Sequence, residues 1–87
     1  MSDLYNFNPS QIVVYSTERC SDCRRAKAFL DIQHIPHLTV PLEGDERATH
    51  FVSEINHGYH SVPTIIFPDG SILVEPTLEE LQSKFST

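Results

Sequence analysis

Two cysteines, Cys20 and Cys23, stand where a predicted strand gives way to a predicted helix. The β-branched and aromatic run over residues 12–15 favours a strand. After Cys23, apolar residues recur at helical spacing until Pro36, which disfavours a continued helix. This junction constrains the chain most, because a strand leading directly into a helix is the first half of an α/β unit.

The predicted helix places Cys20 at its N-terminal edge. Unpaired backbone N–H groups and the positive end of the helix dipole would face the Cys20 sulfur there and stabilise its thiolate. Charged residues surround the pair, three basic and two acidic: Arg19, Arg24, Arg25, Glu18 and Asp22. We therefore predict that Cys20 is an activated nucleophile.

Disulfide exchange requires a nucleophilic thiolate with a second thiol nearby, and one helical turn separates these two cysteines. Cys20 would attack a disulfide, and the more covered Cys23 would resolve the product. A C-x-x-C pair beside a β-α pattern is a recognised redox signature. Alone, such a pair is also compatible with two buried thiols or a structural disulfide. Cys20 and Cys23 are therefore the predicted catalytic residues.

Length and charge narrow the function classes. A chain of 87 residues forms one domain, and its net charge of −6 argues against nucleic acid or an anionic membrane as the main partner. The sequence shows no signal-type N-terminus and no run long enough to span a membrane. We therefore expect a cytoplasmic protein, in a compartment where a cysteine pair is more often catalytic than structural.

The other elements follow from apolar periodicity and turn residues. We expect a loosely ordered extension over residues 1–10 and a domain over 11–87. Expected strands cover residues 12–15, 38–40, 62–67 and 71–74, and expected helices cover 21–34, 45–57 and a segment opened by Thr77. Glu80 stands at the capping-box position of that last helix, and Pro-Asp-Gly at 68–70 predicts a hairpin turn.

The resulting order is β-α-β-α-β-β-α. A strand, a crossover helix and a strand form a right-handed parallel unit, and the closing hairpin adds an antiparallel edge. The sequence therefore predicts an α/β fold, a four-stranded mixed sheet with helices on both faces. Cys20 would lie at the C-terminal end of a strand, where open α/β sheets place their sites.

These features resemble the glutaredoxin family within the thioredoxin fold, over about residues 11–85. Two motifs carry the resemblance together with the element order: Thr17-x-x-Cys20-x-x-Cys23 and Ser61-Val62-Pro63-Thr64. The resemblance implies a thioredoxin-like fold with a cis Val62–Pro63 bond beside the nucleophile. It also implies that the Val62 backbone pairs with an extended thiol peptide.

Two segments depart from the usual glutaredoxin pattern. Ser21-Asp22 replaces Pro-Tyr between the cysteines, and Val74-Glu75-Pro76-Thr77 replaces a Gly-Gly motif. Residues 67–71 and 74–77 are more similar to the mycoredoxins, actinobacterial relatives that act on mycothiol mixed disulfides. Thr77 and the first N–H groups of its helix would bind a carboxylate or sugar-proximal group of the thiol, or Thr77 caps only its own helix. The substrate-binding residues we expect are Arg19, Val62, Pro63, Pro76 and Thr77.

The resemblance implies a thiol-disulfide oxidoreductase that reduces mixed disulfides between proteins and a low-molecular-weight thiol. The co-substrate would be mycothiol or glutathione, and we expect no tightly bound cofactor. The expected partners are that small thiol and protein mixed disulfides, with no nucleic acid and no membrane. We expect a monomer.

Two other functions stay open. One is a thioredoxin-like hydrogen donor, reduced by thioredoxin reductase and serving, for example, ribonucleotide reductase. The other is a non-enzymatic carrier of a metal or an iron–sulfur cluster, as some glutaredoxins hold a bridging cluster. The cysteine pair followed by His34 and His37 superficially resembles a zinc site, but the intervening Pro36 prevents the usual helical presentation.

Overall fold

A computed structural model describes residues 3–86 and contains seven elements in the predicted order. They are β1 (Ile12–Ser16), α1 (Ser21–Ile32), β2 (His37–Pro41), α2 (Glu46–Ile55), β3 (Thr64–Ile66), β4 (Ile72–Val74) and α3 (Leu78–Phe85). None of the helices in this part of the chain is long and apolar enough to cross a membrane.

Helices α1 and α2 end earlier than predicted. In both cases a histidine shortly beyond the helix adopts a left-handed conformation, with φ of 56° at His34 and at His57. The Ile35 N–H then donates to the Leu30 carbonyl at 2.9 Å, which closes the last turn of α1. Periodicity missed these ends because glycine, and not histidine, is the usual residue at that position.

The four strands form one mixed sheet in the order β2-β1-β3-β4. β1 runs parallel to β2 and antiparallel to β3, and β3 pairs with β4 in an antiparallel hairpin. Tyr15 near the end of β1 is opposite Thr64 at the start of β3, and Thr64 is opposite Val74 at the end of β4. The end of β1, the start of β3 and the end of β4 therefore lie together at the same end of the sheet.

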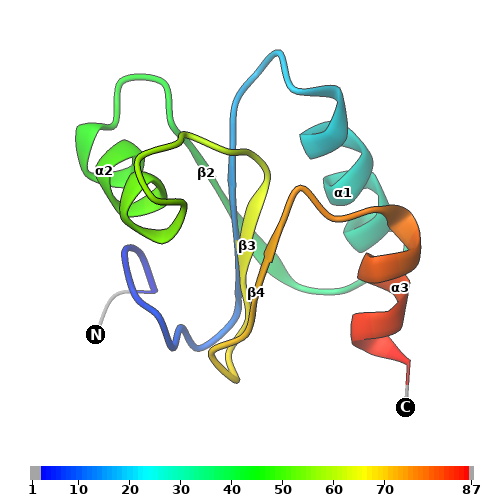
Figure 1. Ribbon diagram of the computed structural model, residues 1–87. Coiled ribbons are helices and arrows are strands. Elements are labelled where there is room, and N and C mark those ends of the chain that lie inside the picture. The colour runs from blue at the N-terminus through cyan, green and yellow to red at the C-terminus, as the bar shows by residue number, and fades with distance from the viewer. Residues whose placement is uncertain (1–2, 87) are drawn as a thin grey trace.

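Helices cover both faces of the sheet, as predicted, with α2 on one face and α1 and α3 on the other (Figure 1). Alternate β1 side chains point to opposite faces. Val13 and Tyr15 pack in the core beneath α2, whereas Ile12 and Val14 pack in the core beneath α1 and α3. All of β1 is buried, which accounts for its continuous apolar run.

Residues 3–10 of the N-terminal segment lie against the α2 face. The Tyr5 N–H donates to the Tyr15 hydroxyl, and the Tyr5 hydroxyl donates to the Asp45 carboxylate, both at 2.9 Å. The rings of Phe7 and Phe51 lie 4.9 Å apart between centroids. Isolated aromatic anchors hold this segment, and they leave no periodic pattern in the sequence. The first two residues lie outside the described part of the chain.

The β3–β4 turn has the predicted chemistry. Gly70 has a φ of 88°, and its N–H donates to the Phe67 carbonyl at 2.9 Å. The Lys84 ammonium contacts the Asp69 carboxylate at 2.8 Å, and Ser71 donates to the same side chain. Lys84 first, and then Ser71, hold the pKa of Asp69 far below its usual range. This contact joins the turn to α3.

Candidate active site

Cys20 is the N-cap residue of α1, which agrees with its predicted place at the N-terminal edge of that helix. Its backbone is extended, and its sulfur accepts the Cys23 N–H at 3.0 Å. The sulfur therefore occupies the place that a serine or aspartate oxygen usually takes at a helix start. A donated N–H in the first turn of a helix is the arrangement that stabilises a negatively charged sulfur. The Cys20 side chain remains partly exposed and can reach a substrate.

Cys23 has a different environment, because it is fully buried. Burial first, and then the neighbouring Cys20 sulfur, raise the pKa of the Cys23 thiol to about 12. The Thr17 backbone N–H and the Lys27 ammonium act in the opposite direction. The two free thiols thus differ in exposure, and exposure decides which of them a disulfide in solution meets first.

The Val62–Pro63 bond is cis and lies beside the cysteines. The Cys20 thiol donates to the Val62 carbonyl at 3.7 Å, and the Pro63 carbonyl accepts the Glu75 N–H at 2.9 Å. Val62 is partly buried and Pro63 is buried. The start of α1, the approach to β3 and the end of β4 are therefore brought to one site.

Thr77 directs its hydrogen bonds into α3. Its hydroxyl accepts the Glu80 N–H at 3.1 Å, and the Glu80 carboxylate accepts the Thr77 N–H at 2.9 Å. This is a complete capping box, the local role that the sequence left open for Thr77. Pro76 precedes it and is partly buried.

The three arginines near the cysteines differ in their contacts. Arg24 donates to the Glu18 carbonyl and Arg25 pairs with Asp22, each at 3.0 Å. Arg19, directly before Cys20, is exposed.

Sequence reasoning missed one residue at this site, Glu43 in the β2–α2 connection. Its carboxylate accepts the Glu18 N–H at 2.8 Å, across 25 positions of sequence. This hydrogen bond is the first cause that lowers the pKa of Glu43. No spacing or motif could have indicated it, because the contact joins a surface side chain to a distant backbone group.

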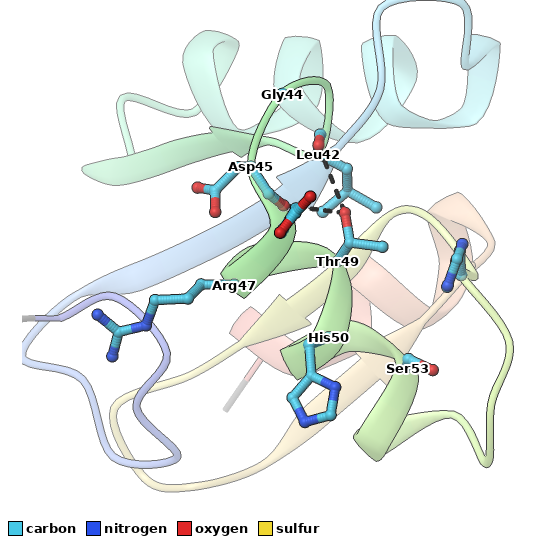
Figure 2. Close-up of a pocket in the computed structure, with 9 residues that line it drawn as sticks. Leu42, Gly44, Asp45, Arg47, Thr49, His50 and Ser53 are labelled. Carbon is cyan, nitrogen blue, oxygen red and sulfur yellow. Dashed lines mark hydrogen bonds between the residues drawn. The ribbon is translucent and has the colours of Figure 1, made fainter.

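A broad open hollow of about 990 Å³ lies along α2 (Figure 2). The lining consists of residues from the β2–α2 connection and α2, together with one loop histidine: Leu42, Gly44, Asp45, Glu46, Arg47, Thr49, His50, Ser53 and His60. Several of these polar groups already have partners. Thr49 donates to the Asp45 carbonyl at 2.9 Å, and His50 contacts Glu54 at 2.6 Å. Neither cysteine lines the hollow, so it is separate from the candidate active site.

A metal site would need several converging ligands. Within residues 3–86, no group of three or more His, Cys, Asp or Glu side chains is placed to hold a metal ion. The cysteine pair therefore has no further ligand of these kinds from its own described chain.

Comparisons with known proteins agree with this geometry. The family model described as glutaredoxin matches residues 12–72. A Mycobacterium tuberculosis protein named "Putative glutaredoxin" is 36% identical over 73 residues, 84% of this chain and 87% of its own. Mycoredoxin 1 of Corynebacterium glutamicum is 32% identical over 75 residues, 86% of this chain and 92% of its own. Among solved structures, a thioredoxin-like protein aligns with a TM-score of 0.73 and 26% identity, over 84% of this chain and 97% of that one.

Proposed function

The chain belongs to the glutaredoxin family of thiol-disulfide oxidoreductases, and from this premise we propose that Cys20 reduces mixed disulfides between proteins and a small thiol. The observation that carries the proposal is the Cys20 sulfur at the start of α1, bonded to the Cys23 N–H and within reach of solvent.

The reaction has two exchange steps. The Cys20 thiolate attacks the small-thiol sulfur of the mixed disulfide, the old S–S bond breaks, and the target protein leaves as a thiolate that takes up a proton. A second small thiol then attacks as its thiolate, releases the symmetrical disulfide and restores the Cys20 thiolate. In the net reaction one free small thiol reduces one mixed disulfide, which yields the reduced target protein and the symmetrical disulfide of the small thiol.

Cys23 serves a dithiol route in this proposal. Its burial and raised pKa keep it protonated at neutral pH, so it attacks slowly compared with a dissolved thiolate. This supports the monothiol route as the main one, with Cys23 able to expel a bound target or protect Cys20.

The substrate would lie along Val62 and Pro63, with Arg19, Pro76 and Thr77 at its sides. The Val62 carbonyl beside the Cys20 sulfur supports strand-like pairing with the cysteinyl part of the thiol. Exposed carboxylates stand around the start of α3: Glu75, Glu79 and Glu80. They favour a neutral polar group there over an anionic one, which supports the sugar-containing mycothiol over glutathione. The similarity to mycoredoxin 1 supports the same choice.

Replacing Thr77 by valine should lower stability by about 1 kcal/mol, because the capping hydroxyl is lost. If Thr77 also contacts the thiol, the KM for the small thiol should rise. Thermal unfolding and steady-state kinetics measure the two effects separately. Thr77→Ser keeps the hydroxyl and is the matched control. An unchanged KM in the valine variant would remove Thr77 from the binding site.

Intact mass of the Cys23→Ala variant tests the proposal and identifies the thiol. The variant is incubated with the disulfide of glutathione and, separately, of mycothiol, and then with the matching free thiol. We expect a reversible adduct on Cys20, formed more completely with mycothiol. The Cys20→Ser/Cys23→Ala variant should remain unmodified. Absence of an adduct with both disulfides would contradict the monothiol mechanism.

A thioredoxin-type hydrogen donor is the second candidate, supported by the fold shared with a thioredoxin-like protein. It predicts reduction by thioredoxin reductase and indifference to small thiols. Oxidised protein incubated with the reductase and NADPH would separate the two functions, since our main proposal predicts negligible NADPH consumption. An iron–sulfur carrier would instead show visible absorbance when purified under anaerobic conditions.

A further inference from the structure

We propose that Glu43 is a positioning residue for Cys20, acting through the Thr17–Glu18 peptide group. Glu43 lies outside both sequence motifs, in the connection between β2 and α2. Its effect on the nucleophile would pass through two hydrogen bonds that share one peptide plane.

The two bonds lie on opposite ends of that peptide group. The Glu43 carboxylate accepts the Glu18 N–H at 2.8 Å, and the Thr17 carbonyl accepts the Cys20 N–H at 3.4 Å. The first bond is short and charge-assisted, and it polarises the peptide so that its carbonyl becomes a better acceptor. Glu43 therefore fixes the plane that orients the Cys20 backbone.

The connection that carries Glu43 is itself anchored. The Leu42 N–H donates to the Ser16 carbonyl at 2.9 Å, and the Asp45 N–H donates to the Leu42 carbonyl at 3.0 Å. Leu42 is buried, and Gly44 takes the φ of 73° that the turn requires. Figure 2 shows this short turn leading from Leu42 through Gly44 into α2. Residues 17–20 form the loop between β1 and α1 that ends in Cys20. Glu43 thus reaches this loop from a turn that is fixed to the end of β1.

A second charged side chain holds the same loop from the other side. Arg24, in the first turns of α1, donates to the Glu18 carbonyl at 3.0 Å. The backbone N–H and C=O of Glu18 are therefore taken by side chains from two different elements. Rotation of either neighbouring peptide would break one of these bonds, so the loop keeps the Cys20 sulfur facing the Val62 carbonyl.

A pure charge effect of Glu43 would have the opposite sign. A carboxylate near Cys20 disfavours a second negative charge, so its removal alone would speed reaction at the sulfur. The Lys27 ammonium on α1 also acts on Glu43, and the Glu18 side chain on the same loop is exposed. Positioning and charge can therefore be separated by a variant that keeps the acceptor and removes the charge.

The first test measures alkylation of Cys20 by iodoacetamide at pH 7 in the Cys23→Ala background. Glu43→Ala should slow it about three- to tenfold, because the loop is released. Glu43→Gln should restore most of the rate, because its amide oxygen can accept the Glu18 N–H. Glu46→Ala, which removes an exposed carboxylate at the start of α2, is the control. Equal rates in the alanine and glutamine variants, or faster reaction in both, would overturn the proposal.

The second test uses the wild-type protein and needs no substrate. We expect the Glu18 amide proton to shift as Glu43 ionises, at a pH below the ordinary glutamate range, and the Cys20 amide proton to follow with smaller amplitude. Both shifts should vanish in Glu43→Gln. A Glu18 amide proton whose chemical shift does not change as Glu43 ionises would refute the proposal. Neither test depends on which thiol is the substrate, so their failure is distinct from failure of the proposed function.

Discussion

Cys20→Ser should lower turnover of a protein–small-thiol mixed disulfide by at least about a thousandfold, whereas Cys23→Ser should retain most of it. The partly exposed sulfur at the start of α1 is the group placed to meet a disulfide in solution. A serine hydroxyl stays protonated at neutral pH and cannot form a disulfide, so no exchange intermediate exists in that variant.

The measurement is reduction of a mixed disulfide between a cysteine-containing peptide and the small thiol identified by intact mass. The peptide product is followed directly, with the small thiol as sole reductant. The Cys20→Ser/Cys23→Ser variant sets the background rate. Loss of activity in Cys23→Ser as large as in Cys20→Ser would show that a dithiol cycle is obligatory. That result would overturn the monothiol assignment and favour the hydrogen-donor function.

The order of the elements and the place of Cys20 could be predicted because both depend on local sequence. The apolar run of β1 and the helical spacing after Cys23 are short-range patterns, and the structure confirms both. The capping box at Thr77 was also predicted and is present, because all its members lie within one turn. The cis Val62–Pro63 bond came instead from the family resemblance.

The parts that could not be predicted depend on contacts between distant segments. Tyr5 and Phe7 dock on α2 as single aromatic side chains, so residues 3–10 carry no periodic signal despite their contacts. Glu43 resembles any surface glutamate in sequence, and only the folded sheet brings it to Glu18. The burial that raises the pKa of Cys23 is likewise a property of the packed core beneath α1. Local sequence patterns thus placed Cys20 at the start of α1, while tertiary packing determines its surroundings.

Because the Cys23 thiol is buried, we expect the folded protein to lose stability at alkaline pH. The folded protein holds the Cys23 proton up to a pKa of about 12, whereas the unfolded cysteine releases it near its ordinary value of 9.0. Above pH 9 the unfolded state therefore binds fewer protons, and the free energy of unfolding falls as pH rises. The full stabilisation is present below the unfolded pKa, and about 2 kcal/mol should disappear between pH 9 and pH 10.5.

Urea unfolding of Cys20→Ser against Cys20→Ser/Cys23→Ala isolates this contribution, since neither variant can form a disulfide within the chain. The pKa values of Tyr5 and Tyr15 are also raised, and they destabilise both variants equally in the same pH range. The stability difference between the two variants should therefore shrink as the pH increases, by up to about 2 kcal/mol. The change should be smaller than in the wild type, because the Cys20 sulfur that also raises the pKa of Cys23 is absent from both variants. A difference that stays constant would mean that the Cys23 thiol ionises in the folded protein as easily as in the unfolded chain. Its burial would then be no barrier to a fast dithiol route.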